Sequence, residues 1–397
     1  MVAATAKKPA IPISSKMLSW ARGWAGVSIE AAAKRVGVES ERVQEWEKPE
    51  SGVKPTVRQA RELADLYGRQ FVEFFRGEPP PEAQPSKVPD FRLHRGAEDP
   101  TSLREMRDIR VWAEAQRENA LTLFEEVGED VPAIPASMFV SMRTGPETAA
   151  KIAREKMGFP IEEQVGRNIN DRRLIPNIIR VCIEPLGILC LKHTRLSALG
   201  TRGFCLAVFP LPIIVFGNEA ASAQAFTLLH ELAHVMLKSS AISGPINRSG
   251  RSDVEKQLEN WCDQFAGAFL MPEAVVNAYM PRPNAPAPEI ADERLAALAD
   301  YFGVSRHAAL IRLLHLQYVD PKFYWGAQKA QFEKEESEYR GFGRATYYGS
   351  RFRNALGDLY TGLVIDAWSR GKITNHHAAE YMGIENLAHL RDIRENF

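Results

Sequence analysis

Two histidines and a glutamate stand close together in an otherwise apolar segment, residues 225–238 (AFTLLHELAHVMLK). His230 and His234 are four residues apart, so on a helix their rings lie on one face, about one turn or roughly 5–6 Å apart. That spacing lets both rings reach one metal ion. Glu231 cannot share the ligating face and points beside the ion, where it can accept a proton from a bound water. The H-E-x-x-H spacing therefore predicts two metal ligands and a general base.

A catalytic zinc needs a third protein ligand and one open position. Glu259, on the next predicted helix, is the candidate ligand. Asp263, four residues later on the same helix face, can orient a ligating histidine through its second ring nitrogen. E-x-x-x-D downstream of H-E-x-x-H is the arrangement of thermolysin-like metallopeptidases. The site predicts metal-assisted peptide hydrolysis, with Glu231 as the base, Zn²⁺ as cofactor and Mn²⁺ as the alternative metal.

Two plainer interpretations of these residues stay open. One is a pair of core histidines satisfied by their neighbours, and the other is a degenerate site that no longer cleaves. The residue that would stabilise the oxyanion is not identified by the sequence, although Tyr279 and His193 are candidates.

The composition is that of a globular protein. The 397 residues include 50 basic and 50 acidic side chains, so any electrostatic case for nucleic acid must be local. No apolar run approaches the ~18 residues that span a bilayer, and no signal peptide is recognised, so we expect a cytoplasmic protein without membrane contact. The four cysteines lack C-x-x-C spacing, which favours reduced core thiols.

The hydrophobic periodicity and two proline-rich stretches predict a mainly helical, α+β architecture of several domains. Short β-branched runs at 188–195, 203–210 and 212–218 predict a small sheet just before the H-E-x-x-H helix. The last of these strands could pair with an extended substrate by edge addition, although its apolar side chains favour a plain core strand. The expected divisions are a flexible tail (1–13), a five-helix unit (14–78), a proline-rich linker with a charged connecting helix at 101–127 (79–139), a metal-binding domain (140–285) and a C-terminal helical domain (286–397).

The segments "FTLLHELAHVML" and "E..CDQFAGAFLMP" resemble the ImmA/IrrE family of metallopeptidases, over roughly residues 140–285. The resemblance implies a zincin-like fold, with His230, His234 and Glu259 as zinc ligands and Glu231 as catalytic base. It also implies a protein substrate, an Xre-type repressor or antitoxin, whose cleavage would derepress stress-response, phage or mobile-element genes. At position 262 the family more often has alanine, and Cys262 suggests redox sensing as a further hypothesis.

Near the N-terminus, Ser28 is placed to cap a helix at 29–36, and a turn at Gly37 leads to a second helix at 40–47. This helix-turn-helix spacing resembles the Xre (lambda-repressor-like) family. The resemblance implies that the second helix enters the major groove of promoter DNA. The helix is acidic, however, so binding to a protein and homodimerisation are the alternatives, and a regulator with a silent peptidase domain is the competing function. The residues expected to contact DNA are Ser40, Arg42, Gln44, Lys54 and Arg58.

Overall fold

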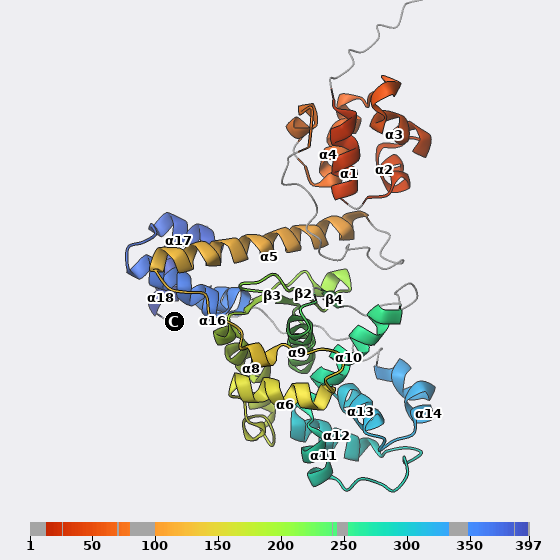
Figure 1. Cartoon of the computed structure of the whole chain (residues 1–397), viewed down its shortest axis with the longest axis vertical. Coiled ribbons are helices and arrows are strands. Elements are labelled where there is room, and N and C mark those ends of the chain that lie inside the picture. The colour runs from red at the N-terminus through yellow and green to blue at the C-terminus, as the bar shows by residue number, and fades with distance from the viewer. Residues whose placement is uncertain are drawn as a thin grey trace, which may run out of the picture. The chain divides into compact units, whose positions relative to one another are not determined.

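The structure is a computed structural model that describes residues 13–25, 27–69, 71–79, 100–239, 241–243, 253–332, 348–384 and 386–395. The chain divides into two compact units, residues 1–110 (the helical unit) and residues 111–397 (the sheet unit), and the division falls inside one helix, α5 (Figure 1). Helices dominate both, and the sheet unit adds a small β-sheet, which confirms the predicted fold class. Among the described helices, none combines the length and apolar character needed to cross a bilayer.

The helical unit begins with four α-helices whose ends follow local sequence signals. Ser14, Ser28 and Thr56 accept hydrogen bonds from backbone N–H groups at the starts of α1, α2 and α4. Gly37 and Gly68 end α2 and α4 in the left-handed conformation that favours glycine. The elements are α1 (Ser15–Trp24), α2 (Ile29–Val36), α3 (Ser40–Glu47), the 3₁₀ turn η1 (Pro49–Ser51), α4 (Val57–Tyr67) and the 3₁₀ turn η2 (Phe71–Phe75).

The predicted bounds of α2 and α3 are confirmed, whereas the expected fifth helix is the 3₁₀ turn η2. Residues 1–12 of the predicted tail lie outside the described residues, and Ile13 is buried in the core of the helical unit. Most of the predicted proline-rich linker, residues 80–99, also lies outside them.

The helix α5 (Pro100–Val127) matches the predicted connecting helix, and its residues Ile109, Ala113, Ala120 and Leu123 are buried. Its first turns belong to the helical unit, where Arg107 donates a hydrogen bond of 2.9 Å to the carbonyl of Tyr67 at the end of α4. The rest of α5 lies against the sheet (Figure 1).

The sheet has four short strands in the order β1-β3-β2-β4. The strands β1 (Leu189–Lys192) and β3 (Ile213–Phe216) are parallel, while β2 (Gly203–Leu206) runs antiparallel to both β3 and β4 (Ala241–Ser243). The strand at 212–218 is not an edge strand, because β3 pairs with β1 on one side and β2 on the other, so the suggested edge pairing with a substrate was wrong and the alternative of a core strand is confirmed. The strand β4 was not predicted.

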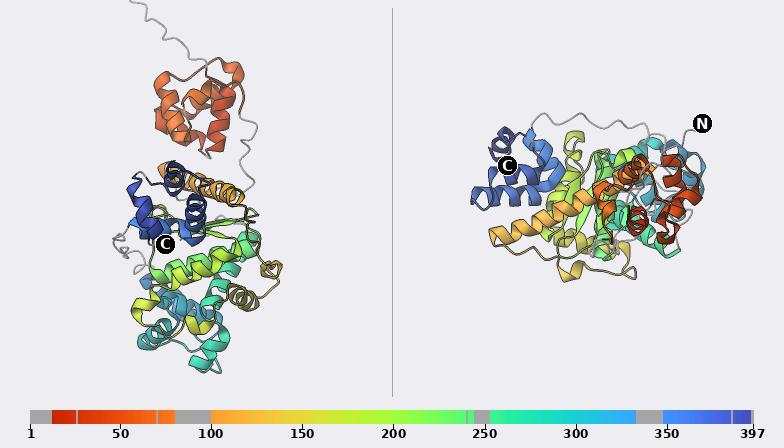
Figure 2. Two further views of the ribbon diagram at one scale, coloured as in Figure 1. Left: turned by 90° about the vertical axis from the view of Figure 1, so that its left-hand side faces the viewer. Right: turned by 90° about the horizontal axis from the view of Figure 1, so that it is seen from above.

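Two layers of helices cover the sheet. Residues 111–127 of α5 lie on one face, and α9 (Ala221–Met236) lies on the other with α10 (Asp253–Leu270) beyond it (Figures 1 and 2). The remaining elements on the side of α9 are η3 (Ala136–Met138), α6 (Pro146–Met157), η4 (Ile161–Glu163), α7 (Ile169–Arg172), α8 (Ile175–Ile183), α11 (Glu273–Tyr279), α12 (Asp292–Phe302), α13 (Arg306–His315), α14 (Pro321–Phe323) and the π-helical turn η7 (Tyr324–Gln328). Two further 3₁₀ turns, η5 (Glu184–Leu186) and η6 (Ser197–Leu199), flank β1.

One hydrophobic core runs through the sheet unit from Met138 to Phe332 and includes Leu295, Phe302 and Leu310. The packing therefore shows no break at the boundary predicted at 285/286. The domain boundaries themselves stay predictions.

The last three helices, α16 (Tyr348–Ser369), α17 (Asn375–Met382) and α18 (Ala388–Glu395), pack together, and α16 contacts β1. A buried ion pair fixes α16 there. Arg180 bonds to Glu184 at 3.0 Å and to the carbonyl of Asn354 at 2.7 Å. The helix is interrupted at Gly357, whose φ of 86° favours glycine, and the Glu184 carboxylate accepts the backbone N–H groups of the two residues that follow, at 2.8 and 2.9 Å. Burial raises the pKa of Glu184, although Arg180 opposes the shift.

Candidate metal centre

Helix α9 carries the H-E-x-x-H residues into the core. His230 is 5% exposed, and Glu231 and His234 are fully buried. The helix packs under β2 and β3 along most of its length, which its continuous apolar sequence explains. The Nε2 atoms of His230 and His234 lie 3.2 Å apart, so the two rings point at one position as the i, i+4 spacing predicts.

Helix α10 brings Glu259 to the same position. Its two carboxylate oxygens lie 3.6 Å from the Nε2 atoms of His230 and His234, and the three ligand atoms lie within 4.8 Å of one another. Tetrahedral ligands at the usual Zn–N distance of about 2.0–2.1 Å are about 3.3–3.4 Å apart. The observed separations are close to this value, so the donor set and its spacing fit a zinc ion.

The outer nitrogens of the two histidines have different partners. Nδ1 of His230 lies 2.9 Å from Asp263, while Nδ1 of His234 lies 3.7 Å from the Cys262 thiol. Burial lowers the pKa of His230, but hydrogen bonds to Asp263 and Glu259 outweigh it and raise the pKa to about 10. The carboxylates around His230 therefore favour a positive charge on the ring or next to its Nε2 atom, which a proton or a divalent cation can supply.

Cys262 has the surroundings of an inert thiol. It is fully buried, and burial raises its pKa far above the usual range, with nearby Glu259 and Glu231 adding to the shift. Since the thiolate is the reactive form, these surroundings disfavour the redox-sensing hypothesis.

Three side chains, two of them buried, fix the C-terminal end of α10 by bonding to the carbonyl oxygens at and just after its end. Arg154 of α6 donates to Phe269 at 2.8 Å, Gln164 to Leu270 at 2.8 Å, and Arg312 of α13 to Met271 at 2.9 Å. The last carbonyls of a helix have no intrahelical partner, so these bonds satisfy them inside the core. They also hold in place the helix that carries Glu259 and Asp263.

The two oxyanion candidates have other surroundings. The ring of His193 packs on Trp112 of α5 with centroids 5.0 Å apart, and α5 covers the sheet face opposite α9. The ring of Tyr279 packs on Tyr301 at 4.6 Å, in the contact between α11 and α12. The geometry therefore gives neither residue a place beside the histidines.

The residues expected to contact DNA are scattered over the helical unit, and their cations are engaged. Arg42 pairs with Glu45 at 2.9 Å, Arg58 pairs with Glu62 at 2.9 Å, and Lys54 donates to the hydroxyl of Ser15 at 2.6 Å. Ser40 and Gln44 lie on α3 beside Arg42, with Gln44 exposed.

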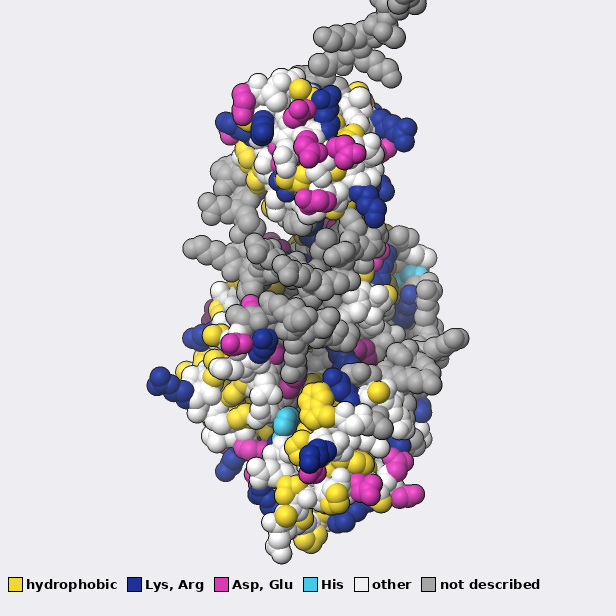
Figure 3. Space-filling view, turned by 90° about the vertical axis from the view of Figure 1, so that its right-hand side faces the viewer, with side chains coloured by type: hydrophobic (Ala, Val, Ile, Leu, Met, Phe, Trp, Pro, Cys, Tyr) yellow, Lys and Arg dark blue, Asp and Glu magenta, His cyan; other side chains and the backbone are white. Residues whose placement is uncertain are grey.

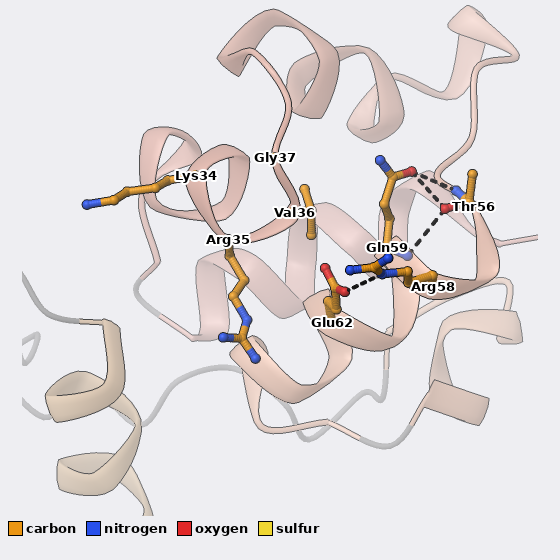
Figure 4. A pocket seen from close by; sticks show the side chains of 8 residues that line it. All are labelled: Lys34, Arg35, Val36, Gly37, Thr56, Arg58, Gln59 and Glu62. Carbon is orange, nitrogen blue, oxygen red and sulfur yellow. Dashed lines mark hydrogen bonds and ion pairs between the residues drawn. The ribbon is translucent and has the colours of Figure 1, made fainter.

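A shallow pocket of about 570 Å³ lies between the end of α2 and the start of α4. Figure 4 shows that the Lys34 side chain points away from the other lining residues, and that Arg58 turns toward Glu62. On the face shown in Figure 3, acidic and basic side chains of the helical unit are interspersed. Among the described side chains on that face, no continuous basic surface of the kind that binds phosphates is visible.

Comparison with known families supports the chemistry of the metal centre. Residues 181–314 match the family model of the IrrE N-terminal-like domain, a peptidase family. The matched segment contains all five residues predicted for the site, His230, Glu231, His234, Glu259 and Asp263, so the similarity supports a metallopeptidase-type function. The helical unit lies outside it, and its resemblance to Xre proteins stays a prediction. No curated protein matches the chain.

Proposed function

We propose that this protein is a zinc-dependent endopeptidase whose centre lies between α9 and α10. The convergence of His230, His234 and Glu259 on one position carries the proposal. Two imidazole nitrogens and one carboxylate are a donor set that suits zinc, with the remaining position open for solvent and substrate. When bound there, the ion would lower the pKa of water and polarise the scissile carbonyl.

The protein side chains would perform the proton transfers. Glu231 follows His230 on α9 and is fully buried beside the ligands, so its carboxylate is suited to take a proton from the attacking water. It would then deliver that proton to the leaving amine. Asp263 accepts the Nδ1 proton of His230, which leaves Nε2 with a free electron pair for the ion and fixes the ring.

The proposed substrate is an Xre-type repressor or antitoxin, as the ImmA/IrrE resemblance implies. For the helical unit we propose contact with a protein rather than with promoter DNA. Glu39 precedes the α3 helix, which carries Glu41 and Glu45, and Arg42 between these two is in an ion pair with Glu45. Phosphates would be repelled by that surface.

The enzyme proposal is tested with purified protein. Elemental analysis should find one zinc per chain, lost in Glu259→Ala. The wild type should cleave the repressor encoded beside its gene, and should give defined cuts in a proteome-derived peptide library read by mass spectrometry, whereas Glu231→Gln should not. Metal uptake without cleavage under Zn²⁺ or Mn²⁺ would favour a sensor that regulates transcription. A wild type that binds no metal would overturn the proposal.

Whether the helical unit binds DNA or protein is tested with single substitutions in that unit, made in the full-length protein. Binding to its own promoter that weakens steeply with salt, and that falls in Arg42→Ala and Lys54→Ala, would contradict the protein assignment. We expect no such binding, and expect a charge reversal at Glu41 to reduce association with the repressor.

A further inference from the structure

Position 203 requires glycine because neighbouring atoms leave no room for a side chain, and not because of its backbone conformation. Gly203 is the first residue of β2 and is buried between Phe216 of β3 and Ser243 of β4. It is not among the glycines with positive φ, so any residue could adopt its backbone conformation. A glycine inside a strand often marks a place where another group approaches the backbone closely.

Two of the three close groups belong to α9 and the third belongs to β3. A Cβ atom at position 203 would lie 2.6 Å from Cγ2 of Thr227, 3.0 Å from the carbonyl oxygen of Val215 and 3.1 Å from Oε1 of Glu231. Thr227 and Glu231 are four residues apart, so they share the helix face that meets β2. The carboxylate of Glu231 therefore lies next to the space that a side chain at position 203 would occupy.

Two of these three neighbours cannot move easily. The carbonyl of Val215 belongs to the β3 backbone, which is paired on both sides. Thr227 is β-branched and buried, and its hydroxyl bonds to Glu219 at 3.4 Å, so a rotation of its side chain would break that bond. The Glu231 side chain has more rotatable bonds than Thr227, so it would yield to an added methyl group.

We propose that Gly203 is a positioning residue for the reaction: its missing side chain lets the Glu231 carboxylate lie under β2 and beside the metal ligands. This inference rests on the proposed function, in which Glu231 is the base. A misplacement of about 1 Å in a catalytic group can cost about 10²-fold in rate. Strand β2 thus limits where the Glu231 carboxylate can lie relative to the two histidines.

The test compares Gly203→Ala with Gly203→Ala/Thr227→Ser, in which the closest methyl group is removed and the hydroxyl kept. The substrate is the peptide cut fastest in the library described above. In Gly203→Ala we expect kcat to fall about 10²-fold with KM and zinc content unchanged, and the crystal structure to show Glu231 displaced. In the double variant most of the loss should be recovered, with Glu231 returned.

Gly145→Ala is the control, because a Cβ there meets no atom within 4 Å and its φ is −62°. It should keep the wild-type kcat. If Gly203→Ala alone is too unstable to purify, a double variant that folds and turns over near the wild-type rate still supports the steric contact.

A Gly203→Ala protein with zinc bound, Glu231 in place and full kcat would overturn the inference and leave the proposed function intact. A drop in kcat with Glu231 still in its wild-type position in the crystal structure would also overturn it. Failure of the wild type to bind zinc or cleave any peptide would overturn the proposed function first, and this inference with it.

Discussion

The metal centre and the α3 helix of the helical unit both concentrate charged and polar residues, but they arrange them in opposite ways. In the centre, two imidazole nitrogens lie 3.2 Å apart with a carboxylate facing both, so electron pairs converge on one position inside the core. On α3, Arg42 and Glu45 face each other at 2.9 Å with about half of each side chain exposed. Convergent electron-pair donors favour the binding of a cation, whereas the opposite charges of an ion pair already neutralise each other.

The largest expected effect is on catalysis. Glu231→Gln keeps the shape of the side chain but removes the base, so we expect kcat to fall by about 10²–10⁴-fold with zinc content unchanged. Turnover and elemental analysis of the same preparation would measure this. Loss of zinc together with activity would instead make Glu231 part of the metal site.

The next effect concerns the support of α10. Gln164 is fully buried and donates to the carbonyls of Leu270 and Phe302, both at 2.8 Å. Gln164→Leu leaves both carbonyls unsatisfied, so we expect the free energy of unfolding to drop by about 2–4 kcal/mol. Gln44→Leu, on the exposed side of α3, is the matched control and should change it by less than about 0.5 kcal/mol. Equal effects in urea unfolding would contradict the contrast.

The pH dependence of the metal-free protein gives a third test. The pKa of His230 is raised from 6.5 to about 10 in the folded protein. The protonated ring therefore adds stability that is complete below pH 6.5 and is lost as the pH rises toward 10. In chelator-treated protein the free energy of unfolding should fall across this window by at most ~1.4 kcal/mol per pH unit.

With zinc bound the ring is a neutral ligand, so this slope should disappear. Urea unfolding at several pH values, with and without zinc, measures the difference. An identical slope in both states would mean that the ion does not bind at His230.

The smallest effect is expected on α3. Arg42→Ala removes an exposed ion pair, which contributes at most ~1 kcal/mol to stability. Thermal unfolding should hardly change, and association with the partner protein should not weaken. A clear loss of promoter binding in this variant would instead restore the DNA hypothesis.

Local signals in the sequence predicted the local parts of the structure. The i, i+4 spacing predicted that His230 and His234 point together, and the residues at Ser28 and Gly37 predicted the ends of α2. Glu259 was identified because an E-x-x-x-D motif follows H-E-x-x-H and places Glu259 and Asp263 on one helix face. Local sequence signals also predicted a fifth helix at the end of the helical unit, where the structure has the 3₁₀ turn η2, because a short apolar run fits an α-helix and a 3₁₀ turn equally well.

The parts that depend on distant contacts could not be read from the sequence. The neighbours of β3 come from β1 and β2, and no local pattern states which strand lies at an edge. Gly203 and Gln164 act on groups 12 or more residues away, and a single glycine or glutamine carries no periodic signal. Sequence likewise gave His193 and Tyr279 as candidates by residue type, and only the arrangement of α5 and α12 assigns their rings elsewhere.

The interruption of α16 at Gly357 has a consequence for how the end of the chain may be altered. A methyl group at that position would come within 2.0 Å of the Glu184 carboxylate, so the joint tolerates no side chain. Truncating the protein before residue 348 would remove the two backbone N–H groups that donate to the buried Glu184 carboxylate. It would also remove the Asn354 carbonyl that accepts from Arg180. Shortened versions that spare the metal-binding helices should therefore aggregate, and any detachable segment is better sought at the other end of the chain.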